Sequence, residues 1–321
     1  MAQQFHVANS ARIMGAGIFA AGPYACAAGG FPLTMLRSLD VCSDVLSPLP
    51  FFGPPDPKRA ITAADDAAQA GLIDPTATLH ADRVLLFSGR LDTLVPTSVM
   101  QSLATFYEHF VDAQSIRFIT DIKAQHAMVT AGYGNACDAL ADPFISNCGF
   151  DLAGTTLQHI YGPLAAPVRA DGRMITFFQG EFTDPTRPAG LADDGFAYVP
   201  KRCADGGCRL HVVFHGCRQN AETIGDVFYR HAGYNEWAEA NDIVVLYPQA
   251  AALTRTFAGA TIPWPNPQGC WDWWGFTGDD YARRSGPQIA AVSAMIDLLA
   301  GDAPVSGSSE PESSCARADD E

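Results

Sequence analysis

An aspartate and a histidine stand just beyond two segments that have the pattern of buried strands. Asp92 follows the apolar run at 84–87, and His126 follows the short segment at 115–119. Such runs are typical of strands buried on both faces of a sheet, and open α/β sheets place their chemistry beyond the carboxyl ends of the strands. An aspartate and then a histidine at successive strand ends form the last part of a Ser…Asp…His hydrolase order. A turn aspartate and a surface loop histidine are the alternative interpretation.

The element between these two strands is predicted to be a helix over 98–110, because Val99, Leu103, Phe106 and Phe110 recur along one stripe. Patterns of the same kind predict helices at 2–10, 61–71, 155–161, 234–240 and about 289–299, and strands at 15–21, 174–179, 210–214 and 243–247. The proline-rich stretch 46–57 is predicted to be a surface loop, and the mixed stretch 165–195 is the best internal boundary. We expect one α/β domain over 1–302 and a disordered acidic tail over 303–321.

A second candidate for chemistry is the turn His215-Gly216-Cys217, which follows the apolar segment 210–214. In α/β hydrolases a His-Gly turn after a strand offers a backbone N–H to the oxyanion of the tetrahedral intermediate. An ordinary strand-to-loop turn is the first alternative. A metal site from His211, His215 and Cys217 is the second, but no carboxylate or second cysteine completes such a site, and we expect no metal and no cofactor.

All five tryptophans lie in the last third of the chain, and three of them fall in the segment GCWDWWG at 269–275. An aromatic loop of this kind offers an apolar or stacking surface to a polyester or a sugar ring. Filling the core is the alternative, and we expect it to hold for Trp271. Trp273 and Trp274 are the candidate substrate-binding residues.

The overall charge bears on the partners. A formal net charge of −15 disfavours nucleic acid and anionic membranes as partners, and no apolar run is long enough to span a bilayer. We expect a monomer that acts on a polyester or oligoester.

Nine cysteines are many for a cytosolic enzyme, and none is spaced as Cys-x-x-Cys. By position they fall into the couples Cys26 and Cys42, Cys137 and Cys148, Cys203 and Cys208, and Cys217 and Cys270, with Cys315 left over. This usage indicates an oxidising compartment, although the first residues show no signal-peptide pattern.

With these residues in view, the sequence resembles the extracellular poly(3-hydroxybutyrate) depolymerase family in its circularly permuted form, over nearly the whole chain. The segments that carry the resemblance are FAAGPYAC (19–26), LFSGRLDTLVP (86–96), QH (125–126), ISNC (145–148), LHVVFHGC (210–217), GYNEWA (233–238), LYPQA (246–250) and GCWDWWG (269–275).

The resemblance implies a permuted α/β-hydrolase fold, a mostly parallel sheet with helices on both faces, and hydrolysis of short-chain hydroxyalkanoate esters outside the cell or in the periplasm. It implies Asp92 and His126 as members of a catalytic triad and the Cys217 N–H as an oxyanion donor. It also implies Trp273 at the substrate crevice, and disulfides within the four cysteine couples. Permutation accounts for the unusual order, in which the oxyanion turn follows Asp92 and His126 instead of preceding them.

One feature departs from the family. No G-x-S-x-G occurs in these residues; Ser88 lacks that pattern and Ser285 lies in a charged segment. The family's nucleophile precedes the helix that opens this chain, so we expect the serine and a signal peptide upstream of Met1, and an inactive chain without them. The alternatives are a feruloyl or acetyl esterase on plant polymers, and a non-catalytic polymer-binding relative of the hydrolases.

Overall fold

The structure is a computed structural model that describes residues 1–29, 33–45, 53–257 and 260–301. Its helices are α1 (Ala2–Ala8), α2 (Leu33–Asp40), α3 (Pro57–Gln69), α4 (Thr97–Phe110), α5 (Leu152–Tyr161), α6 (Ala221–Ile224), α7 (Val227–His231), α8 (Asn235–Asn241) and α9 (Pro287–Ala300). Its strands are β1 (Gly15–Phe19), β2 (Arg83–Phe87), β3 (Ile116–Ile119), β4 (Met128–Thr130), β5 (Asn135–Ala136), β6 (Ile145–Asn147), β7 (Arg173–Phe178), β8 (Asp194–Val199), β9 (Arg209–Val212), β10 (Ile243–Tyr247), β11 (Leu253–Phe257) and β12 (Ala260–Asn266).

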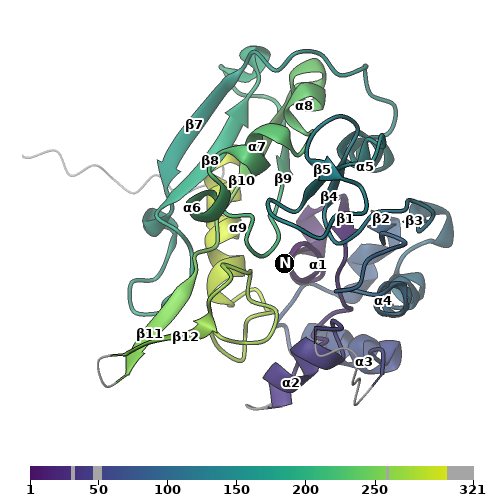
Figure 1. The fold of residues 1–321 in the computed structure, drawn as a ribbon, viewed down its shortest axis with the longest axis vertical. Coiled ribbons are helices and arrows are strands. Elements are labelled where there is room, and N and C mark those ends of the chain that lie inside the picture. The colour runs from purple at the N-terminus through teal and green to yellow at the C-terminus, as the bar shows by residue number, and fades with distance from the viewer. Residues whose placement is uncertain (30–32, 46–52, 258–259, 302–321) are drawn as a thin grey trace, which may run out of the picture.

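Two sheets form the centre of the molecule. One has the order β1-β2-β3 and is parallel throughout. The other has the order β7-β8-β10-β9, in which β9 runs parallel to β10 and β8 runs antiparallel to both of its neighbours. In Figure 1 the strands follow one another across the view from β7 at the upper left, through β8, β10 and β9, to β1, β2 and β3 at the right.

Both sheets lie between the same two layers of helices. Along β2, Val84 and Leu86 join a buried cluster with α1, α3, α4 and α9, while Leu85 and Phe87 join a second cluster with α5, α7 and α8. Strand β10 of the other sheet divides in the same way, since Leu246 belongs to the first cluster and Val245 to the second. The alternation is that of strands buried on both faces, and it makes the two sheets parts of one α/β layer.

The edges of the two sheets that approach one another are β9 and β1. Two helices span both edges. On α5, the Tyr161 hydroxyl donates to the Leu210 carbonyl of β9 at 3.1 Å, and Thr156 packs so closely on Gly17 of β1 that a Cβ there would lie 2.4 Å from the threonine methyl. On α1, the Phe5 ring lies 5.8 Å from that of Phe214, just after β9. Within the described residues, β9 pairs only with β10 and β1 only with β2.

Most of the predicted elements are found, with shifted ends. Strand β1 ends at Phe19 because Ala20 has a φ of 48°, a left-handed conformation that interrupts a strand. The predicted loop 46–57 is wrong at its last residue, since Pro57 opens α3; proline suits the first helical position, and the Asp56 side chain accepts the Lys58 N–H at 3.0 Å. The segment predicted at 210–214 is a strand only to Val212.

Other elements were not predicted. Strand β8 lies across the end of the stretch taken as a boundary, and α2, the small β4-β6-β5 sheet and the β11-β12 hairpin are additions. Residues 46–52 of the predicted loop, the predicted tail over 303–321 and Cys315 lie outside the described residues. Of the helices in the described part of the chain, none combines the length and the apolar character needed to cross a bilayer.

Candidate active site

Asp92 and His126 meet beyond the carboxyl ends of β2 and β3. The two loops that carry them are joined by backbone hydrogen bonds, from Arg90 to the Ile122 carbonyl at 2.8 Å and from Leu91 to the Ala124 carbonyl at 2.9 Å. Gly89 permits this approach, because a Cβ there would lie 2.4 Å from the Ala124 oxygen. The local structure after β2 therefore fixes where Asp92 stands relative to the histidine loop.

The aspartate holds the imidazole through one oxygen and the backbone through the other. His126 Nδ1 lies 2.9 Å from Asp92 Oδ2, while Oδ1 accepts the N–H groups of Leu94 at 2.9 Å and Val95 at 2.8 Å. The Asp92 side chain is 1% exposed, and that of His126 is 31% exposed. His126 Nε2 has no hydrogen-bond partner among the described residues, so it is available to a reacting group. This is the arrangement of a general base oriented by a carboxylate.

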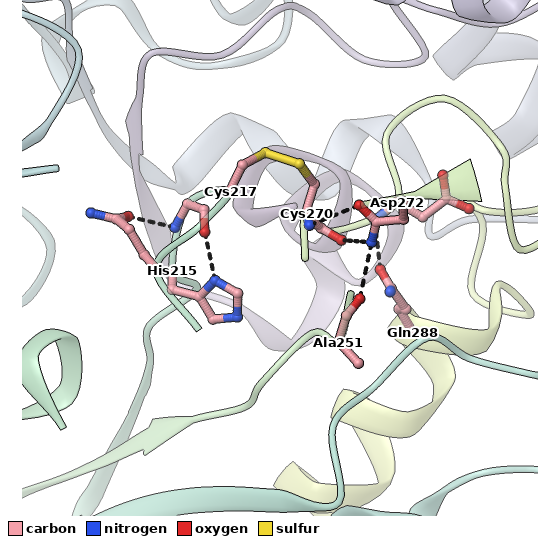
Figure 2. The surroundings of a disulfide bond; sticks show 9 residues. His215, Cys217, Ala251, Cys270, Asp272 and Gln288 are labelled. Atoms are coloured by element: carbon pink, nitrogen blue, oxygen red, sulfur yellow. Dashed lines mark hydrogen bonds between the residues drawn. A yellow bond between two sulfur atoms is a disulfide. The ribbon is translucent and has the colours of Figure 1, made fainter. Parts of the chain in front are cut away.

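The turn after β9 is fixed at its first residue by a buried histidine. His215 Nδ1 donates to the Gly216 carbonyl at 2.7 Å (Figure 2), and its Nε2 accepts the Ala250 N–H at 3.0 Å. Burial, which disfavours the charged ring, lowers the pKa of His215 to about 4. His215 is therefore a neutral structural residue with a defined tautomer, and it ties this turn to the loop after β10.

The next residue carries the candidate oxyanion donor. Cys217 is bonded through its sulfur to Cys270, and its backbone N–H has no hydrogen-bond partner within the described structure. An unpaired N–H beside a strand end is what an oxyanion would require. The metal alternative for His211, His215 and Cys217 is wrong, because the Cys217 sulfur is in a disulfide and both ring nitrogens of His215 are occupied by backbone groups.

The aromatic loop at 271–277 is organised by the carboxylate of Asp272. Its Oδ1 accepts the N–H groups of Trp274, Gly275 and Phe276, and its Oδ2 accepts both the N–H and the hydroxyl of Thr277 at 2.7 Å. Burial raises the pKa of Asp272, and these hydrogen bonds oppose that shift. The loop is thereby held in one shape next to the disulfide that joins it to the turn after β9 (Figure 2).

The tryptophans of this loop differ in burial. Trp271 is 4% exposed and packs against Phe214 and His215, so it fills core as expected. Trp273 and Trp274 are partly exposed and pack against the small cluster around the Cys26–Cys42 disulfide, with their rings 5.3 Å apart. Both rings therefore keep part of their surface open to solvent, and neither has a ring or hydrogen-bond contact with His126 in the described part of the chain.

All four expected cysteine couples are disulfides: Cys26–Cys42, Cys137–Cys148, Cys203–Cys208 and Cys217–Cys270. Two of them bear on the site. Cys217–Cys270 fastens the turn after β9 to the aromatic loop, and Cys137 accepts, through its carbonyl, the N–H of Gln125 beside the histidine.

The two serines considered from the sequence are engaged elsewhere. Ser88 is fully buried and its hydroxyl pairs with that of Thr97 at 3.0 Å, while the Ser285 hydroxyl donates to Asp280 at 2.8 Å. Neither contacts His126.

Two residues with a clear part in shaping the site were not singled out from the sequence. Asp272 was considered only as part of the aromatic segment, although an aspartate often begins a turn by accepting backbone N–H groups further along the chain. Gln219 gave no signal of its link to the histidine loop, because the Phe144 carbonyl to which it donates lies 75 positions away in the chain.

A scan against models of known protein families gave no match. Among characterised proteins, the chain is 42% identical over 306 residues to a poly(3-hydroxybutyrate) depolymerase of Delftia acidovorans, covering 93% of this chain and 57% of that protein. It thus spans little more than half the length of that relative. It is 33% identical over 310 residues to a polyhydroxybutyrate depolymerase of Talaromyces funiculosus, covering 93% of this chain and 86% of that protein.

Two solved structures have folds similar to that of this chain. Each has a TM-score of 0.77 and 30% sequence identity, and each match covers 90% of this chain and 88% of the other. One is the crystal structure of a PHB depolymerase from Penicillium funiculosum, and the other is a serine-to-alanine variant of a PHB depolymerase in complex with an R3HB trimer. Together with the identity over most of the Talaromyces protein, these findings assign the family: the chain belongs to the polyhydroxybutyrate depolymerases.

Proposed function

We propose that this protein hydrolyses the ester bonds of poly(3-hydroxybutyrate) or of related short-chain hydroxyalkanoate esters. The observation that carries the proposal is the Asp92–His126 pair, with a buried carboxylate 2.9 Å from Nδ1 and an unoccupied Nε2. The names of the relatives supply the substrate class.

In this mechanism a serine attacks the ester carbonyl while His126 Nε2 takes its proton. Asp92 keeps the other ring proton on Nδ1 and stabilises the imidazolium that forms. The Cys217 N–H, together with the N–H that follows the serine, binds the oxyanion of the tetrahedral intermediate. His126 then gives the proton to the leaving alcohol. In the second step His126 takes a proton from water, which attacks the acyl-enzyme, and then returns the proton to the serine as the acid is released.

We further propose that the serine lies outside these 321 residues, in a strand and turn that enter between β9 and β1. Two observations support this. The edges of β9 and β1 are unpaired within the described residues although α5 and α1 span both, and neither Ser88 nor Ser285 contacts His126. A strand placed there would pair with both open edges and join the two sheets into one.

For the substrate, we propose that Trp273 and Trp274 form one wall of the binding crevice. Both rings are partly exposed, and the Asp272 carboxylate and the Cys217–Cys270 disulfide hold their loop beside the turn that carries the Cys217 N–H. The four disulfides also support an oxidising location, outside the cell or in the periplasm. A monomer is the proposed state, to be checked by light scattering.

The test compares substrates with the full-length protein, meaning this chain together with any residues that its gene encodes before Met1. Release of 3-hydroxybutyrate from polymer film is expected to exceed release of ferulate or acetate from sugar esters. Preferential hydrolysis of feruloyl or acetyl esters would replace the polyester assignment with the plant-polymer one.

A non-catalytic polymer-binding relative is the second candidate, since these residues contain no G-x-S-x-G. Binding to polyhydroxybutyrate granules, with Trp273→Ala beside the unaltered protein, separates the two. Granule binding without any ester hydrolysis by the full-length protein would favour the binding role; binding together with hydrolysis supports the enzyme.

A further inference from the structure

We infer that Gln219 is a positioning residue that couples the turn carrying the Cys217 N–H to the loop carrying His126. The inference rests on the proposed function, because it concerns the same site. Gln219 is 5% exposed and follows Cys217 by two residues. Its side-chain amide contacts the turn directly, and it reaches the His126 loop through the Phe144 carbonyl.

The first half of the coupling concerns the direction of the Cys217 N–H. The Gln219 Oε1 accepts the Gly216 N–H at 2.7 Å, and the Gly216 carbonyl accepts Nδ1–H of His215 at 2.7 Å. That carbonyl and the Cys217 N–H belong to one planar peptide unit and point in opposite directions. With both polar groups of Gly216 engaged, the direction of the Cys217 N–H is set (Figure 2).

The second part of the coupling links Gln219 to the histidine loop through the carbonyl oxygen of Phe144. Gln219 Nε2 donates to the Phe144 carbonyl at 2.7 Å, and the same carbonyl accepts the N–H of Met128 at 2.8 Å. Met128 opens β4, two residues after His126. The proposed oxyanion donor and the proposed general base are thus connected by a short series of hydrogen bonds through Gln219.

This connection matters because the two groups come from different sheets. The turn follows β9 of one sheet, whereas the His126 loop follows β3 of the other. A reacting ester carbonyl must meet donor and base in one geometry, and misplacement by about 1 Å is costly. A glutamine suits the task, since its amide offers an acceptor and donors together, whereas glutamate lacks the donors. Gly216 is fitted to it too, as a Cβ there would lie 2.6 Å from Gln219 Oε1.

The kinetic test is Gln219→Glu in the full-length protein, with a soluble hydroxybutyrate oligomer as substrate. Glutamate keeps the acceptor toward Gly216 and loses the donor toward Phe144. We expect kcat to fall about 10²-fold, as when an oxyanion contact is impaired, with KM changed less than about 3-fold. A kcat within about 3-fold of the unaltered protein would overturn the inference.

Asn241→Asp is the matched control. Asn241 also accepts one backbone N–H, from Ala165 at 2.8 Å, and donates to two carbonyls, but it lies before β10, at the end of the sheet away from the site. Its kcat is expected to stay near that of the unaltered protein. An equal loss of kcat in Asn241→Asp would show a general stability effect and would overturn the positioning role.

A second measurement needs no activity and also uses the full-length protein. Amide hydrogen exchange at Gly216 and at Met128 is compared between the unaltered protein and Gln219→Met, which keeps the side-chain length and removes its hydrogen bonds. Faster exchange at both amides is expected; an unchanged rate at Met128 would overturn the coupling. If the full-length protein hydrolyses no ester, the proposed function fails, while this exchange result still decides whether Gln219 joins the two loops.

Discussion

The substitution Asp92→Asn tests the orientation of the histidine, and the structure determines how the new amide must sit. Asp92 Oδ1 accepts two backbone N–H groups, from Leu94 and Val95, so the oxygen of an asparagine stays there. The NH₂ group is then placed 2.9 Å from His126 Nδ1, where Asp92 Oδ2 lies now. His126 must accept from it at Nδ1 and carry its own proton on Nε2. That tautomer cannot take a proton from a serine.

The expected loss follows from this change of tautomer. In serine hydrolases the corresponding exchange lowers kcat by about 10⁴-fold, which equals about 5.4 kcal/mol of transition-state stabilisation at 1.36 kcal/mol for each factor of ten. Stability should change little, because both hydrogen bonds to Oδ1 remain. Both assays use the full-length protein: kcat on a soluble hydroxybutyrate oligomer, and nitrogen NMR of the His126 tautomer.

The control is Asp82→Asn. His6 Nε2 lies 2.9 Å from Asp82 Oδ2, so this buried pair has the same oxygen–nitrogen distance as Asp92–His126 but lies outside the proposed site. This variant should keep kcat. The reasoning would be refuted if Asp92→Asn retained more than about a tenth of kcat, or if His126 kept its proton on Nδ1 in that variant.

Three further outcomes are expected. The Cys217–Cys270 disulfide closes a loop of 53 residues, and its removal should lower the free energy of unfolding by about 4 kcal/mol. Removal of Cys203–Cys208, with a separation of only 5, should lower it by about 2 kcal/mol. Urea unfolding of the two paired Cys→Ser variants measures both losses, and equal losses would contradict this expectation. Burial lowers the pKa of His215 from 6.5 to about 4, so the stability that its neutral ring provides is present above pH 6.5 and is lost as the pH falls toward 4, by about 3 kcal/mol. His215→Gln should therefore weaken the pH dependence of the unfolding free energy over that range without abolishing it, because burial lowers the pKa of His211 to about 4 as well. Trp273→Ala should raise KM on the oligomer several-fold with little change in kcat, and a reversed pattern would remove Trp273 from the binding wall.

The positions of Asp92 and His126 followed from local sequence patterns. Their strands are short apolar runs, and chemistry beyond strand ends is a general property of α/β sheets, so the pair could be predicted without knowing the fold. The cysteine couples gained support from the family resemblance, and all four are disulfides.

The parts that could not be predicted depend on partners far apart in the chain. Gln219 and the Phe144 carbonyl are separated by 75 positions, and the sequence around neither residue indicates the contact. Strand β8 was not predicted because Gly195 and the acidic residues before it are typical of a turn. The segment is a strand because it pairs with both β7 and β10. In each case tertiary pairing outweighs local propensity.

The central claim, ester hydrolysis by a serine that His126 activates, is tested most directly by labelling the full-length protein with a fluorophosphonate and mapping the adduct by mass spectrometry. The account predicts one labelled serine, within a G-x-S-x-G that lies before Met1, and loss of labelling in His126→Ala. An adduct on Ser88 or Ser285, or labelling that persists in His126→Ala, would contradict it.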